Sequence, residues 1–143
     1  MNLHHVGFWV DDIDEMIDFL VGVMEGQLLS RRRFDSGDGE RAFVKVGEGQ
    51  VIEILTQAVM QPRPAMTPHM ANGAGAVVGI PHLCFQVTDL WSWEERLTSL
   101  GYAIHHKMPD HGGYRRFEFG SVRAMFFTGP GGIDFELFEF EKE

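Results

Sequence analysis

The chain has 143 residues, with 12 basic and 21 acidic side chains and a formal net charge of −9. That charge disfavours nucleic acids and anionic membranes as partners. No apolar run approaches the ~20 residues that cross a bilayer, no leader of basic then apolar residues is visible, and the single Cys84 excludes an internal disulfide. We therefore expect a cytoplasmic protein of one domain or two small modules.

The first half reads as a strand, a helix and three further strands. A strand is predicted at 3–10, and Asp12 follows as an N-cap with Glu15 as its capping-box partner. Apolar residues at helical spacing come next, and Gly26 is predicted to close the helix. The three strand-like runs that follow, separated by turn residues, are 27–34, 41–46 and 50–56.

The second half repeats this order and adds one short hairpin strand. A strand at 80–87 leads to the N-cap Asp89, and an apolar stripe from Leu90 to Leu100 ends at Gly101. The strand-like runs after it are 102–107, 114–119, 122–128 and 133–140. Between the halves, 58–79 is rich in Pro, Gly, Ala and Met, which predicts a linker loop.

This repeat predicts an α+β fold made of two βαβββ modules, 1–57 and 80–143. A single module leaves one face of its sheet bare. Pairing two modules buries part of those faces and forms an open, barrel-like mixed sheet around a cleft.

Two histidines occupy equivalent places in this repeat. His5 opens HVGFWV and His82 opens HLCFQV. Alternation along a strand puts both histidines on the face away from the helix, because the more uniformly apolar residues take the other face. The sequence thus predicts that both imidazoles point into the cleft.

The last strand of each module carries a carboxylate in an equivalent place. Glu53 lies between isoleucines in VIEIL, and Glu136 lies between Phe135 and Leu137 in DFELF. Burying an unpaired carboxylate costs free energy, so such a residue needs a cation or hydrogen-bond donors. Taken singly, a strand histidine is more often a core residue and a strand glutamate more often faces solvent. As two matched pairs, His5, Glu53, His82 and Glu136 favour one divalent cation instead.

The segments HHVGFWVDDIDEMIDF, VGEGQVIEIL, IPHLCFQVTDL and GPGGIDFELFE resemble the vicinal oxygen chelate superfamily of glyoxalases, bleomycin-resistance proteins and extradiol dioxygenases. The resemblance implies paired βαβββ modules around one metal ion. It also implies a ligand set of one His and one Glu or Gln per module, here His5, Glu53, His82 and Glu136. We expect one divalent metal ion, which is Ni, Co, Zn, Mn or Fe.

The activity that this resemblance implies is that of a metal-dependent lyase or isomerase acting on a small oxygenated carbonyl compound. A divalent ion that chelates two neighbouring oxygens makes the adjacent C–H acidic, and a carboxylate moves the proton. Glu136 and Glu53 are the candidate bases. Glu136 is favoured because the glycine-rich turn TGPGG precedes its strand.

The subfamily stays open. Glyoxalase I proper has an Asn-Trp pair after its first Glu, whereas ILTQAVMQPRP follows Glu53, and the methylmalonyl-CoA epimerase branch commonly has Gln at that place. One alternative is an extradiol-type ring-cleavage dioxygenase using His5, His82 and Glu136. Another is a non-catalytic antibiotic-binding protein.

Further side chains are candidates to bind substrate. Arg115 and Arg116 suit a carboxylate or phosphate, and Trp9 lies on the predicted cleft face. The run Arg31 to Arg33 sends side chains to both faces and is either a solvated edge strand or an anion site. Because superfamily members are often dimers, we also expect a homodimer, in which the cleft can form between chains.

Overall fold

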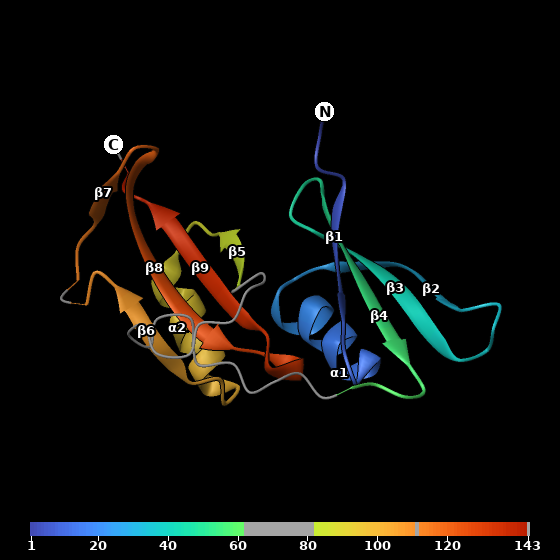
Figure 1. The fold of residues 1–143 in the computed structure, drawn as a ribbon. Coiled ribbons are helices and arrows are strands. Elements are labelled where there is room, and N and C mark those ends of the chain that lie inside the picture. The colour runs from blue at the N-terminus through green and yellow to red at the C-terminus, as the bar shows by residue number, and fades with distance from the viewer. Residues whose placement is uncertain (62–81, 111, 143) are drawn as a thin grey trace. The chain divides into compact units, whose positions relative to one another are not determined.

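The computed structural model describes residues 1–61, 82–110 and 112–142 (Figure 1). The chain divides into two compact units, residues 1–62 and 63–143. Most of the predicted linker, 62–79, and the first two residues of the strand predicted at 80–87 lie outside the described residues. No helix in the described part of the chain has the length and apolarity to span a membrane.

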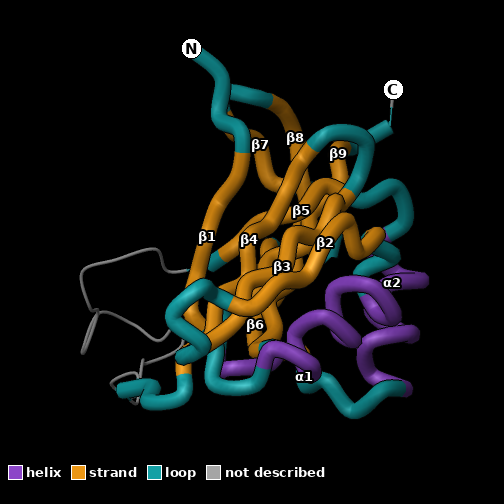
Figure 2. The backbone as a smooth tube through the Cα atoms, turned by 90° about the vertical axis from the view of Figure 1, so that its right-hand side faces the viewer, coloured by secondary structure: helices purple, strands orange, loops and turns teal. Residues whose placement is uncertain are grey.

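The first unit is a four-stranded mixed sheet with a helix on one face. Its strands run in the order β1-β4-β3-β2, with β1 parallel to β4 and the other pairs antiparallel. Helix α1 packs against β3 and β4 (Figures 1 and 2). The elements are β1 (His5–Trp9), α1 (Ile13–Asp18), a π-helical turn (Phe19–Val23), β2 (Gln27–Arg33), β3 (Gly39–Val46) and β4 (Gln50–Gln57).

The second unit repeats this plan with one more strand. Its order is β5-β9-β8-β6, and β7 pairs with β8 as the predicted extra hairpin strand. Strand β5 is parallel to β9, and helix α2 packs against β8 and β9. The elements are β5 (Leu83–Gln86), α2 (Leu90–Ser99), β6 (Ile104–Met108), β7 (Arg115–Phe117), β8 (Gly120–Thr128), a 3₁₀ turn (Pro130–Gly132) and β9 (Asp134–Phe140). The α+β class and the βαβββ modules are confirmed.

Both predicted helix starts are confirmed. The Asp12 carboxylate accepts a hydrogen bond from the Glu15 amide at 3.0 Å, and Asp89 accepts from the Ser92 amide at 3.2 Å. Each bond satisfies an amide that has no partner within its helix. The end of α2 is also as predicted, because Gly101 takes a left-handed conformation with φ of 90°.

The sequence predicted that Gly26 closes the first helix in a left-handed conformation, and this prediction is wrong. The left-handed residue is Glu25, with φ of 59°, and Gly26 does not have a positive φ. Gly26 is required for another reason: a Cβ there would lie 2.7 Å from the Leu20 carbonyl oxygen, which accepts the Gly26 amide. The preceding turn is also π-helical, which widens the helix before it ends.

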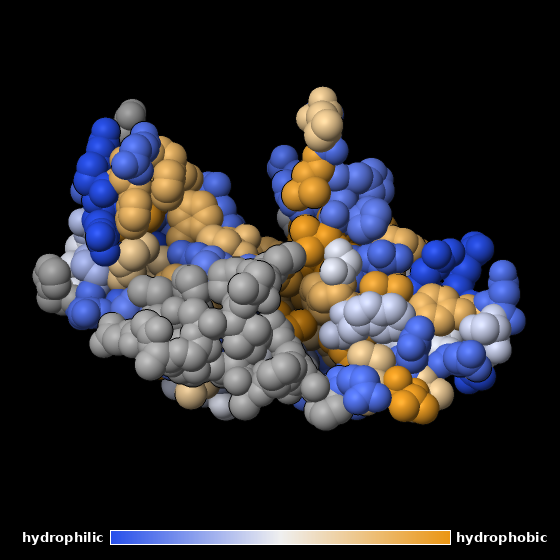
Figure 3. Space-filling view, in the orientation of Figure 1, coloured by the Kyte–Doolittle hydropathy of each residue, from blue (hydrophilic) through white to orange (hydrophobic). Residues whose placement is uncertain are grey.

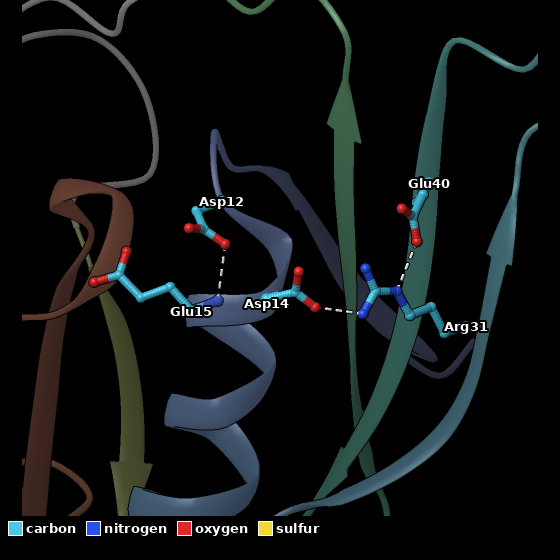
Figure 4. A network of polar contacts seen from close by, with 5 residues as sticks. All are labelled: Asp12, Asp14, Glu15, Arg31 and Glu40. Atoms are coloured by element: carbon cyan, nitrogen blue, oxygen red, sulfur yellow. Dashed lines mark hydrogen bonds and ion pairs between the residues drawn. The ribbon is translucent and has the colours of Figure 1, made fainter.

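Arg31 ties β2 to the helix of its own unit. Its Nη1 donates to Asp14 of α1 at 2.5 Å and its Nε donates to Glu40 of β3 at 2.6 Å (Figure 4). The two carboxylates raise the pKa of Arg31 above its usual range, with Glu40 the larger cause. One member of the arginine run therefore has a structural role on the helix-covered face.

A buried carboxylate fixes α2 to its sheet. Glu139 is 3% exposed and accepts the Leu90 amide at 2.5 Å, the Tyr114 hydroxyl at 2.9 Å and Arg123 Nη2 at 2.6 Å. Because both carboxylate oxygens accept hydrogen bonds and one of the donors is a cation, the negative charge of Glu139 is stabilised inside the unit. The core around it is apolar, with Leu97, Met125, Phe127, Phe135 and Leu137 fully buried.

Candidate metal centre

The first predicted pair, His5 and Glu53, meets on the face of its sheet away from α1. We call this side of each sheet the non-helical face. Strands β1 and β4 are neighbours, and His5 Nε2 lies 3.5 Å from Glu53 Oε2. The Glu53 side chain is 18% exposed, between Ile52 and Ile54, which are buried on the opposite face.

Gly7 makes room for the Glu53 carboxylate. The two residues are partners across β1 and β4, and a Cβ at Gly7 would lie 3.0 Å from Glu53 Oε2. A contact of that length forces one of the two groups to shift. The glycine therefore serves close approach of the carboxylate to the β1 backbone, not an unusual backbone conformation.

The second predicted pair has the same arrangement in the other unit. His82, just before β5, places its Nε2 2.9 Å from Oε2 of Glu136 on β9. The Glu136 side chain is 14% exposed, and its neighbours Phe135 and Leu137 are buried under α2. The structure thus brings each histidine to the glutamate that the repeat assigned to it.

Each histidine contacts a phenylalanine, and the two phenylalanines have equivalent positions in the two units. The sequence did not predict them. Phe43 is the register partner of Glu53, and its ring meets His5 edge-on at a centroid distance of 5.9 Å. Phe126 is the partner of Glu136 and meets His82 edge-on at 5.5 Å. An aromatic ring against each imidazole restricts how that imidazole rotates. Only the register between neighbouring strands places these two phenylalanines beside the pairs, and the sequence alone does not give that register.

Cys84 is a further residue that sequence reasoning did not connect with the pair. It is the register partner of Glu136, at the place that Gly7 occupies beside Glu53. Partial burial and the Glu136 carboxylate raise the pKa of its thiol above the usual range. The thiol is therefore neutral at physiological pH and can donate a hydrogen bond to Glu136.

The predicted substrate-binding residues lie in two places, a hollow in the second unit and the non-helical face of the first. Arg115 and Arg116, both exposed, line a hollow of about 590 Å³ with residues 106–110 and Tyr114. The hollow lies where the β8 edge changes partner from β6 to β7. The Arg115 guanidinium stands 5.3 Å from the Phe117 ring centroid. Trp9 is on the non-helical face of the first unit and 48% exposed.

The chemistry of each pair fits a divalent cation. Two ligands of one ion, each at about 2.0–2.2 Å, stand roughly 3 Å apart, which is the range of both His–Glu separations. Imidazole nitrogen and carboxylate oxygen together suit Zn and other first-row metals. Within the described residues, no group of three or more His, Cys, Asp or Glu side chains is close enough to hold a metal. Each unit on its own therefore brings together two candidate ligands.

Residues 2–137 match the family model described as Glyoxalase/Bleomycin resistance protein/Dioxygenase superfamily. A comparison with curated proteins finds no match. A solved glyoxalase family protein from Enterococcus faecalis is similar, with 21% identity, a TM-score of 0.70, and coverage of 96% of this chain and 97% of that one.

Two further solved structures are named for a function. The fosfomycin resistance protein FosX from Listeria monocytogenes, in complex with Mn(II) and sulfate, has 17% identity, a TM-score of 0.67, and coverage of 98% and 93% of the two chains. A glyoxalase I mutant from Zea mays has 19% identity and a TM-score of 0.66, and the match spans 95% of this chain but 44% of that one. At these identities the likeness establishes the fold.

Proposed function

Because the chain belongs to the Glyoxalase/Bleomycin resistance protein/Dioxygenase superfamily, we propose that it is a metal-dependent lyase or isomerase. Its substrate is a small oxygenated carbonyl compound. The observation that carries this proposal is the duplicated His–Glu pair, at 3.5 Å in the first unit and 2.9 Å in the second.

The metal ligands in this proposal are His5, Glu53, His82 and Glu136, two from each unit. They hold one divalent ion, which is Ni, Co, Zn, Mn or Fe. When bound, such an ion supplies Lewis acidity to two neighbouring oxygens of the substrate. A relative solved with Mn(II), the FosX protein, supports a divalent ion in this fold.

Glu136 is the base in this proposal and Glu53 is the alternative. A proton leaves the C–H beside the substrate carbonyl, its electron pair stays on the substrate, and the proton forms an O–H bond on the carboxylate. Returning it to the neighbouring carbon completes an isomerisation. Phe126 and the neutral Cys84 thiol flank Glu136 in register, and both help to hold its side chain in position.

The remaining contacts to substrate are assigned to Arg115, Arg116 and Trp9. The two arginines border the hollow beside β6, and Trp9 offers an exposed indole on the face that carries Glu53. The homodimer and the cytoplasmic location stay predictions from the sequence. Light scattering of the purified protein tests the dimer directly.

The deciding experiment is metal content by plasma mass spectrometry on untagged protein. We expect about one equivalent of a divalent metal in the wild type and none in a His5→Ala/His82→Ala double variant. His106→Ala, which changes a histidine outside the proposed ligand set, is the matched control and keeps its metal. The metal found then selects the substrate panel: hemithioacetals of ketoaldehydes and acyl-CoA epimers for the non-iron metals, catechols for iron. No metal after reconstitution would contradict the enzyme proposal.

A further inference from the structure

The non-helical face of the first unit is basic, although the chain as a whole is acidic. Strand register places Arg41 beside Leu55 of β4, and Arg32 beside Arg41. Leu55 is two residues from Glu53, and residues two apart in a strand share a face. Both arginines therefore point to the side on which Glu53 lies. Lys45, two residues beyond Phe43, adds a third cation to it.

These cations differ from Arg31 in having no carboxylate partner. Arg31, on the helix-covered face, is bound to Asp14 and Glu40 (Figure 4). Neither Arg32 nor Arg41 makes an ion pair with any residue in the described ranges. Both are exposed. Their guanidinium groups keep all of their charged donors available to an anion.

The side chain of Arg41 is directed along the face toward the His5–Glu53 pair. Its guanidinium carbon lies 5.8 Å from the centroid of the Phe43 ring, and that ring meets the His5 ring at 5.9 Å. Arg41 also sits on β3, an interior strand. A charge placed only to protect a sheet edge would belong on an edge strand, as Arg32 does.

An apolar surface borders the cations. Leu55 of β4 has Arg41 on one side and Trp9 of β1 on the other as its register partners. The Trp9 indole is 48% exposed and meets the Phe34 ring edge-on at 6.4 Å. The row across the sheet is therefore Trp9, Leu55, Arg41 and Arg32. It offers an apolar stretch, Trp9 and Leu55, beside two guanidinium groups.

We propose that this row is an anion subsite of the same centre, with Arg41 as its principal residue. Arg41, assisted by Arg32, binds a carboxylate or phosphoryl group of the substrate. Because rows two residues apart are roughly 7 Å from each other, that group lies about this far from the row of Glu53. Trp9, in the same row as Arg41, offers an apolar contact to the carbon chain. The inference rests on the proposed function and narrows its substrate to carbonyl compounds with a second, anionic group.

The test uses two probes that share a chelating α-keto acid but differ at the far end. 2-Oxoglutarate ends in a carboxylate, and 2-oxohexanoate ends in an ethyl group. Calorimetric titration of the metal-loaded protein gives the dissociation constant of each. We expect 2-oxoglutarate to bind roughly tenfold more tightly, since a charge-assisted hydrogen bond discriminates on that order. We also expect added NaCl to reduce the difference in affinity between the two probes.

Arg41→Gln should reduce this preference to less than about threefold, with the affinity for 2-oxohexanoate and the metal content unchanged. Arg33→Gln is the matched control, because it removes the same charge from the same sheet but on the opposite face. It should leave the preference intact. An Arg115→Gln/Arg116→Gln variant checks the other arginine pair. If that variant removes the preference and Arg41→Gln does not, the anion subsite is not the one proposed.

The metal proposal and the subsite can fail separately. If the protein binds no metal, the proposed function fails, and the titration is run on metal-free protein with 1-naphthyl phosphate against 1-naphthol. An Arg41-dependent preference for the phosphate would still support the subsite. Equal binding of the two naphthyl probes, or a preference untouched by Arg41→Gln, would show that these arginines are only solvated surface charges.

Discussion

At the scale of single residues, the candidate centre depends on how closely two carboxylates approach their surroundings. Glu53 lies over Gly7, and Glu136 lies beside Cys84. The two pairs are equivalent in the repeat, but their neighbours differ: a glycine without a side chain lies beside one carboxylate, and a thiol lies beside the other. This difference supports distinct roles for Glu53 and Glu136.

Glu136→Gln should reduce turnover by roughly 10²- to 10⁴-fold, the range that a positioned base contributes. The amide keeps an oxygen that can still face the metal but cannot take a proton. Activity on the substrate found by the panel is measured together with metal content. If the variant keeps its metal and also keeps full turnover, the base is not Glu136, and Glu53→Gln becomes the next variant to test.

Gly7→Ala should weaken metal binding by roughly tenfold, as changes beside a ligand commonly do. The added methyl carbon meets Glu53 Oε2 at 3.0 Å and displaces the carboxylate. Competition with a fluorescent chelator gives the affinity. Gly49→Ala is the control, because a Cβ there meets no atom within 4 Å. An unchanged affinity in Gly7→Ala would mean that the Glu53 carboxylate does not need this space.

At the scale of elements, alternation along the strands predicted the non-helical face correctly, whereas cross-strand partners could not be read from the sequence. The isoleucines beside Glu53 and the apolar residues beside Glu136 identified their buried faces. Phe43, Phe126 and Cys84 meet the pairs only through register. Register depends on hairpin length and on bulges, such as the one between Leu28 and Ser30.

The first helix shows a second limit on prediction from sequence. Its cap at Asp12 is a local hydrogen bond and was predicted, but its end is not local. Gly26 also approaches Val44 and the Lys45 carbonyl of β3, so the packing of the helix on the sheet selects glycine there. A rule that assigns the left-handed position to the nearest glycine therefore placed it one residue too late.

Asp89→Ala should destabilise the protein at neutral pH but not in acid. Hydrogen bonds from Ser92 lower the pKa of Asp89, so its contribution to stability is present above the unfolded value of about 3.9 and is lost as pH falls through the folded value. Urea midpoints are compared at pH 7 and below pH 3. The variant and the wild type should differ at pH 7 and converge in acid. A constant difference would mean that the carboxylate charge does not matter to the cap.

At the scale of the whole molecule, the surface differs between regions. Figure 3 shows apolar residues at the surface near the tip of β7 and β8, where Phe119 is 66% exposed. Its ring stacks on Phe117 at 5.3 Å. The first unit instead carries the cations and Trp9 on the face of its own pair. The two units thus share a fold and a His–Glu pair but differ in the side chains around that pair.

Adding the metal should stabilise the whole chain. A ligand at 100 times its dissociation constant adds about 2.7 kcal/mol to the free energy of unfolding. We expect a higher melting temperature with metal and a return to the starting value with excess EDTA. His5→Ala and His82→Ala should each reduce the rise at the same metal concentration, because each leaves three of the four proposed ligands and so weakens metal binding. A rise of full size in either single variant would show that the histidine removed in it is not a required ligand.

The division of four proposed ligands into one His–Glu pair per unit has a consequence for assembly. Two separate copies of such a unit would have to find each other in solution, so completion of the centre would depend on protein concentration. A covalent connection between the two units fixes the local concentration of one pair as seen by the other. Within this proposal, a centre built inside one chain is complete at any protein concentration, whereas a centre built between the chains of a dimer is complete only where the dimer forms.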